Sequence, residues 1–273
     1  MEKDVVVLDA CVLYPMYLRD ILLSTAEAGL YLPCWTEKIL EEATGKLVSK
    51  GIKTFEEARQ FGTVIKEAFP EAMVEIPFGL EKVMTNDPKD RHVLAAAVVA
   101  KADIIVTDNI SDFKPEDLAP WNVKAQSADD FLTDLFQAYP DSIVQVVRQN
   151  CNKYTKPKRT FVELLEFLAN KAKVPNFANQ VLFYEYCDFV VQTAKKALSK
   201  IGMPAPEGGR FYEGERYRLW QKRKILTITA KDGRGEILRV QDRQIEGNIL
   251  SQDVIVFQKF AENLDQELEK TRD

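Results

Sequence analysis

Histidine is almost absent from this sequence of 273 residues, which contains only His92. A zinc site with two or three histidine ligands therefore cannot be assembled within one chain. A Ser-His-Asp or Cys-His catalytic arrangement would have to be built around His92, which lies in an apolar run typical of a helix. The sequence thus argues against these mechanisms and favours chemistry that needs no imidazole.

Cysteine and long apolar runs are also scarce. The four cysteines are far apart in the sequence and form no Cys-x-x-Cys pair: Cys11, Cys34, Cys151 and Cys187. We expect buried free thiols rather than a zinc site or a disulfide framework. Apolar stretches such as residues 5–8 and 93–100 are much shorter than the ~20 residues that cross a bilayer. Since the first residues also lack the pattern of a secretory signal, we expect a water-soluble protein of the cytoplasm.

The net charge of -5 conceals an asymmetry between the two halves of the chain. Residues 1–150 contain 15 Lys and Arg against 25 Asp and Glu, whereas residues 151–273 contain 22 against 17. The first half is therefore acidic and the second half basic, which predicts two parts with different functions. With 46% hydrophobic residues, the chain can bury one large core or two smaller ones.

Strand and helix signals alternate in the first half. Uninterrupted apolar runs and turn residues predict five strands, at residues 5–8, 30–33, 73–76, 103–107 and 122–125. Capping residues and terminal glycines predict four helices between them, at residues 17–28, 37–50, 55–69 and 89–101. In the last helix, Asp87 is the expected cap and Pro88 the first helical residue. The alternation predicts an α/β domain with a parallel sheet flanked by helices.

The second half follows other patterns. Residues 127–201 are almost wholly helical in pattern, and residues 202–209, rich in Gly and Pro, resemble a linker. Alternating apolar and polar residues at 212–244 predict a small antiparallel sheet or barrel, followed by a helix at 254–269. We therefore divide the chain into residues 1–140, a helical extension at 141–202, and a basic β-rich module at 203–273.

Four acidic positions point to one crevice. Asp9 ends the first strand, the turn 108–112 follows a later strand, Asp90 lies at a helix start and Glu42 within a helix. Ligands of such sheets bind beyond the carboxyl ends of the strands. Because clustered carboxylates repel one another, a fold that gathers them usually does so to hold a hard cation such as Mg²⁺ or Mn²⁺. Such an ion supports phosphodiester hydrolysis without histidine.

Each acid also has a structural interpretation. Asp9 is suited to cap the following segment, and Asp90 to interact favourably with a helix dipole. Glu41 and Glu42 are ordinary residues of a solvated helix face. No single position therefore establishes the site.

Four motifs taken in order carry a family resemblance. They are VVVLDA at residues 5–10, ILEE at 39–42, DPKDRHVLAAA at 87–97 and IVTDNISDF at 105–113. Together they resemble the successive signatures of PIN-domain proteins over about residues 5–136. The resemblance implies an Mg²⁺- or Mn²⁺-dependent endoribonuclease that hydrolyses RNA. Many proteins of this family are toxins inhibited by an antitoxin, which would then be a partner.

The resemblance also implies which acids act. Asp9, Glu42 and Asp90 match the main acids of the family, with Glu42 preferred to Glu41. The last motif departs from the family's Thr-x-Asp, because Asn109 supplies no negative charge. The fourth acid is then Asp112 or Asp108, and we favour Asp112. Supporting roles in orienting a ligand or the attacking water fall to Thr107, Asp108 and Asn109.

Two other families with an aspartate after the first strand fit less well. Haloacid-dehalogenase-like phosphatases need a second aspartate where this chain has Cys11. Response-regulator receivers carry their aspartate at a later strand and need a lysine near the end. A non-catalytic alternative within the resemblance stays open, in which the chain is a PIN-scaffold protein that binds nucleic acid or regulates a partner.

The basic second half offers a surface for nucleic acid. Residues 208–244 contain ten Lys or Arg against five acids, with interleaved aromatic residues. The predicted nucleic-acid-binding residues are Arg216, Arg218, Trp220, Lys222, Arg223 and Lys224. Two alternatives stay open: the charges solubilise the outer face of a sheet, or the basic module docks on the acidic half, within one molecule or in a homodimer.

Overall fold

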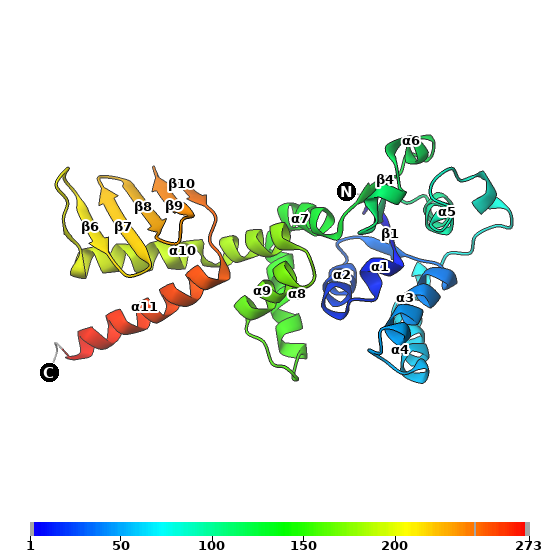
Figure 1. Cartoon of the computed structure of the whole chain (residues 1–273), viewed down its shortest axis with the longest axis horizontal. Coiled ribbons are helices and arrows are strands. Elements are labelled where there is room, and N and C mark those ends of the chain that lie inside the picture. Colours follow the sequence, from blue (N-terminus) through cyan, green and yellow to red (C-terminus); the bar gives the residue numbers. More distant parts are fainter. Residues whose placement is uncertain (1–2, 243, 271–273) are drawn as a thin grey trace. The chain divides into compact units, whose positions relative to one another are not determined.

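The computed structural model describes residues 3–242 and 244–270, in two compact units (Figure 1). The first comprises residues Met1–Lys158 and Phe167–Phe177, and the second comprises Arg159–Glu166 and Ala178–Asp273. Two helices, α9 (Phe161–Asn170) and α10 (Pro175–Ile201), contribute residues to both units. Arg243, one of the basic residues counted above, and both chain ends lie outside the described residues. The domain boundaries at 140 and 202 stay a prediction.

The first unit contains a parallel sheet in the order β2-β1-β3-β4. Its strands are β1 (Val5–Leu8), β2 (Leu32–Cys34), β3 (Ile104–Val106) and β4 (Lys124–Gln126). Val6, Val7 and Leu8 are fully buried, as their uninterrupted apolar run predicts for a central strand. Helices cover the sheet, with α5 packed on β1 and β3, and α2 packed on β2 (Figure 1). The predicted α/β fold is confirmed.

Two helices of the first unit, α3 and α4, begin at the predicted capping residues. Thr36 accepts a hydrogen bond from the Ile39 N–H at the start of α3, and Thr54 and Glu57 form the predicted capping box of α4. The helices and short 3₁₀ turns are α1 (Ala10–Leu13), α2 (Met16–Glu27), α3 (Glu37–Ser49), α4 (Phe55–Ala68), η1 (Pro70–Ala72), η2 (Leu80–Val83), α5 (Arg91–Ala100), η3 (Ile110–Asp112), α6 (Pro115–Leu118), η4 (Ala119–Trp121), α7 (Ala128–Ala138) and α8 (Pro140–Lys153).

The predicted strand at residues 73–76 is wrong. Only an isolated parallel bridge joins Met73 to Trp35. The Trp35 N–H donates to the Ala72 carbonyl, and the Val74 N–H donates to the Trp35 carbonyl. Pairing does not continue, because Thr36 is the N-cap of α3 and the chain becomes helical at Glu37. The sheet therefore has four strands in the described residues instead of five.

The predicted start of the helix at 89–101 is also wrong. Residues 88–90 form a turn, in which the Asp87 side chain accepts the Lys89 N–H at 3.0 Å and the Asp87 carbonyl accepts the Asp90 N–H at 2.9 Å. The helix α5 begins at Arg91, so Asp90 is its N-cap and not its third residue. The Asp90 side chain makes no capping hydrogen bond. The Asp90 carboxylate is therefore available for other contacts at the N-terminus of α5.

The second unit is built on an antiparallel sheet of order β10-β9-β8-β7-β6-β5, which confirms the predicted β-rich module. Its strands are β5 (Met203–Pro204), β6 (Arg210–Glu213), β7 (Tyr217–Lys222), β8 (Ile225–Ala230), β9 (Gly235–Gln241) and β10 (Gln244–Gly247). One strand, β5, lies in the predicted linker 202–209 because it pairs with β6. The final helix, α11 (Ser251–Lys270), packs through Phe257 and Phe260 on Tyr217 and Tyr212.

The remaining global predictions concern thiols and membranes. All four cysteines are free, as predicted, but only Cys11 and Cys34 are buried, while Cys151 and Cys187 are half-buried. Within the part of the chain that the structure describes, every helix is too short or too polar to cross a membrane.

Candidate functional site

Two adjacent parallel strands bring Asp9 and Thr107 together. Asp9 follows β1 and Thr107 follows β3, and the Asp9 N–H donates to the Val106 carbonyl at 3.1 Å. Both side chains are buried, and the Thr107 hydroxyl donates to Asp9 Oδ2 at 2.7 Å. The Asn109 N–H in turn donates to Thr107 Oγ1 at 3.0 Å. The predicted supporting residue Thr107 thus contacts the Asp9 carboxylate, whereas Asn109 acts on Thr107 through its backbone.

A third group at this point, Cys11, was expected to be an inert thiol. Its Sγ lies 3.1 Å from Asp9 Oδ2 as a donor, and it accepts the Asp108 N–H at 3.2 Å. Burial, followed by the negative charge of Asp9, raises the pKa of the Cys11 thiol to about 12. Asp9 Oδ1 has no hydrogen-bond partner among the described residues. Asp9 therefore offers one uncommitted oxygen at the carboxyl edge of the sheet.

The pKa of Asp90 reflects the negative charges around it. Burial, followed by the negative charges of Asp9, Asp112, Asp87 and Glu42, raises its pKa from an ordinary 3.8 to about 6. Charges act on a titrating group in this way only over short distances or through poorly solvated protein. Each of the other three predicted acids, which come from separate parts of the sequence, therefore lies within electrostatic reach of Asp90. Asp87 is a fifth acid that the sequence did not single out.

Asp112 and Asp108 differ in their relation to this cluster. Asp112 lies in η3, and its carbonyl accepts the Asp87 N–H at 3.4 Å, which ties the turn to the segment that carries Asp90. Burial raises the pKa of Asp108, while Lys173 lowers it and Asp9 raises it further. The charge of Asp112 is among the largest that raise the pKa of Asp90, whereas that of Asp108 is not among these largest. The preference for Asp112 as fourth acid is consistent with this difference and stays a prediction.

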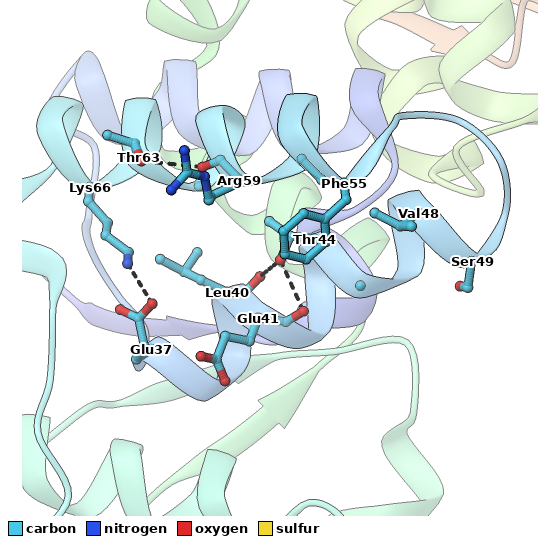
Figure 2. Close-up of a pocket in the computed structure, with 13 residues that line it drawn as sticks. Glu37, Leu40, Glu41, Thr44, Val48, Ser49, Phe55, Arg59, Thr63 and Lys66 are labelled. Carbon is cyan, nitrogen blue, oxygen red and sulfur yellow. Dashed lines mark hydrogen bonds and ion pairs between the residues drawn. The ribbon is translucent and has the colours of Figure 1, made fainter.

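Glu42 and Glu41 face different surroundings. Glu42 Oε1 lies 3.3 Å from Nε2 of His92, whose side chain is fully buried. Burial lowers the pKa of His92, and the negative charge of Glu42 opposes that effect. Glu41 instead lines a pocket between α3 and α4, together with Leu40 and Thr44 (Figure 2). The negative charge of Glu42 also raises the pKa of Asp90, and the choice of Glu42 over Glu41 stays a prediction.

The carboxylate oxygens of the predicted acids are ligands that suit a hard divalent cation, although these side chains do not converge on one point. Within residues 3–242 and 244–270, no three Asp, Glu, His or Cys side chains are grouped closely enough to hold an ion between them. Oxygen ligands and the free Asp9 Oδ1 fit Mg²⁺ or Mn²⁺ as a class.

The six predicted nucleic-acid-binding residues are not gathered on one surface. Arg218, Trp220 and Lys222 alternate along β7 and share the sheet face opposite Leu219, which is buried. Arg223 and Lys224 form the turn that follows β7, whereas Arg216 lines a groove beside α11. Arg218 is paired with Glu213 at 2.8 Å, and Lys224 lies 3.9 Å from Asp242. Acidic neighbours therefore offset part of the positive charge, and the binding role stays a prediction.

A four-stranded parallel sheet flanked by helices, with acids at its carboxyl edge, is the architecture expected of a PIN domain. Residues 5–111 match the PIN domain family, so the first unit of this chain contains a PIN domain. Residues 128–182 match the VapC50 C-terminal domain. The sequence motifs had not identified this second segment, whose pattern is simply that of amphipathic helices.

One curated relative was found. The protein named "Putative ribonuclease VapC50" of Mycobacterium tuberculosis is 41% identical to this chain over 95 residues. The matched part covers 35% of this chain and 55% of that protein. No solved structure matches this chain.

Replacing Asp90 by asparagine is expected to stabilise the cation-free chain at pH 8 and to have little effect near pH 3. The pKa of Asp90 is raised on folding, so its ionisation opposes folding increasingly as the pH rises from about 3.8 to about 6 and fully above that value. The cost disappears at low pH, where the carboxyl is protonated in both states. After allowance for solvent screening, we expect up to about 1 kcal/mol at pH 8. Urea unfolding in EDTA at the two pH values measures it. Equal effects at both would contradict a repulsive cluster.

Proposed function

We propose that this chain is a metal-dependent endoribonuclease. The observation that carries the proposal is the position of Asp9 at the carboxyl end of β1, where Oδ2 is held by hydrogen bonds and Oδ1 has no partner among the described residues. Burial, followed by the charges of Asp9, Asp112, Asp87 and Glu42, raises the pKa of Asp90 and supports it. In this proposal Mg²⁺ or Mn²⁺ is held by Asp9, Glu42, Asp90 and Asp112. When bound, such an ion activates water for attack on phosphorus and stabilises charge on the phosphate oxygens.

The chain's own residues then have defined tasks. Asp9 contributes Oδ1, while Thr107 holds Oδ2 through its hydroxyl. His92 lies beside Glu42 and limits where that longer side chain can lie. Without a cation, the acids would repel an RNA phosphate, so RNA binding at this edge and ion binding are coupled. The substrate is RNA because the family resemblance and the relative named as a ribonuclease both indicate it.

The biological setting is a further part of the proposal. We infer that the chain is the toxin of a toxin–antitoxin pair that acts in the cytoplasm, with an antitoxin protein as its partner. The match of residues 128–182 to the VapC50 C-terminal domain supports this setting. A homodimer is a second partner arrangement, which measurement of the oligomeric state would test.

A second candidate function is RNA binding without cleavage on a PIN scaffold. Asn109 favours it, because a neutral side chain replaces an acid at a position where PIN-domain proteins often have one. The alternation of Arg218, Trp220 and Lys222 along β7 offers a surface for stacking and phosphate contacts. The two candidates differ in whether the RNA chain is broken.

Removal of the divalent ion distinguishes the two candidates. We expect the purified chain to cleave labelled single-stranded RNA with Mn²⁺ or Mg²⁺, to lose this activity in EDTA, and to regain it with excess Mn²⁺. Product lengths on a denaturing gel and RNA affinity by fluorescence anisotropy are measured together. Intact RNA with Mn²⁺, combined with binding that survives EDTA, would replace the proposed function with the second candidate.

A further inference from the structure

We propose that Cys11 is a positioning residue, whose thiol fixes the Asp9 carboxylate so that Oδ1 faces the cation. This inference rests on the proposed function, because it concerns the same site. It assigns a role to a residue that cysteine chemistry alone would leave as an inert, buried thiol.

Cys11 makes three polar contacts in a buried position. Its side chain is 7% exposed and lies in α1, two residues after Asp9. The Sγ donates to Asp9 Oδ2 at 3.1 Å, accepts the Asp108 N–H at 3.2 Å, and lies 3.4 Å from the Thr107 hydroxyl oxygen. Two of these contacts join residues almost 100 positions apart. The thiol therefore ties the end of β1 to the backbone that follows β3.

The two oxygens of the Asp9 carboxylate have different surroundings, because both hydrogen bonds go to Oδ2 and none goes to Oδ1. The Thr107 hydroxyl and the Cys11 thiol both donate to Oδ2, at 2.7 Å and 3.1 Å. Two donors on one oxygen oppose rotation of the carboxylate about its last torsion, which is otherwise soft. Oδ1 is then the oxygen left to meet a cation, and groups that orient a ligand in this way usually affect metal affinity strongly.

A second cysteine provides a matched comparison. Cys34 ends the neighbouring strand β2, is 4% exposed, and has its pKa raised by burial alone. Among the described residues it makes no polar contact with Asp9 or Thr107. The two thiols therefore share burial and lie at, or shortly after, the end of a strand, but only Cys11 contacts a predicted ligand.

Three substitutions at Cys11 separate positioning from packing. Serine keeps a donor and an acceptor, valine keeps apolar volume, and alanine keeps neither. We expect Cys11→Ala and Cys11→Val to weaken Mn²⁺ binding about 10- to 100-fold and to lower kcat more than they change KM for RNA. Cys11→Ser is expected to recover most of the loss. Cys34→Ala is expected to bind Mn²⁺ as the wild-type chain does.

Mn²⁺ titration by isothermal calorimetry gives the affinity without requiring catalysis, and thermal unfolding in EDTA shows whether each variant folds. If Cys11 merely filled space, valine would match the wild type and serine would be the poorest of the three, so that order would overturn the inference. A wild-type chain that binds Mn²⁺ no better than Cys11→Ala would overturn it as well. A wild-type chain that binds no Mn²⁺ would overturn the proposed function along with it.

Discussion

Replacing Asp9 by asparagine is expected to lower RNA cleavage by more than about a hundredfold, because residues that only orient a ligand already contribute 10- to 100-fold. Asparagine keeps the shape and can still accept the Thr107 hydrogen bond, but it removes the charge from the most buried acid of the site. Cleavage rates under saturating Mn²⁺, measured beside Mn²⁺ affinity, test this prediction.

The matched control for this loss is Glu41→Gln. It removes one negative charge from the same unit, but Glu41 lines the pocket between α3 and α4 (Figure 2), whereas it is Glu42 that lies beside His92. We expect the control to retain near wild-type cleavage. If the two variants lost activity equally, general charge would account for the result and Asp9 would have no special role. If Asp9→Asn cleaved RNA at the wild-type rate, the acidic cluster would not be the catalytic site.

Local signals predicted the elements that position the site. The apolar run before Asp9 determined the central strand, and the capping box at Thr54 and Glu57 determined the start of α4. These features depend on neighbours within a few residues, which a sequence displays directly. The order of motifs then identified a PIN-like arrangement. In the structure the charges of Asp9, Glu42 and Asp112 add to burial in raising the pKa of Asp90, and the assignment of these acids as ligands stays a prediction.

Features that depend on distant contacts could not be predicted in the same way. The role of Cys11 requires that β1 and β3 be neighbours, because Thr107 and the Asp108 N–H reach it only through that pairing. The N-cap position of Asp90 follows from a turn closed by Asp87, which competes with the helix start that Pro88 suggests. In both cases a side chain or backbone group outside the local pattern determines the geometry.

In the basic module, too, the strands could be predicted from the sequence but the pairing of charged side chains could not. Alternation of apolar and polar residues predicted the strands of the second unit, since buried Leu219 and Leu226 face its core. The pairing of Arg218 with Glu213 was not visible, because it depends on the register of β6 with β7. A count of basic residues therefore overestimates the positive charge that this sheet presents to RNA.

The same unit contains a buried carboxylate whose loss is expected to be strongly destabilising. Asp253 is fully buried at the start of α11. It accepts hydrogen bonds from the Tyr217 hydroxyl, from the Leu250 N–H at 2.8 Å, and from two Arg234 nitrogens at 2.8 and 2.6 Å. One side chain thus joins the helix, strand β7 and the turn before β9.

Asp253→Asn is expected to destabilise the second unit by about 3 kcal/mol, near the lower end of the range for breaking a buried ion pair. The lower end applies because Arg234 keeps some solvent exposure and a second partner, Asp232. Hydrogen–deuterium exchange of β7 and β8 amides measures the loss within this unit, and amides of β1 serve as an internal reference.

The control is Asp232→Asn, which removes the other acidic partner of the same arginine. Asp232 is exposed, and exposed pairs contribute no more than about 1 kcal/mol, so exchange in β7 and β8 is expected to change little. Comparing the two variants tests the effect of burial of the carboxylate rather than of its charge, because each substitution leaves Arg234 with one carboxylate partner. Equal acceleration by the two variants would mean that the bonds from Tyr217 and Leu250 contribute nothing beyond the ion pair, and the assignment of Asp253 as the joint between helix and sheet would be wrong.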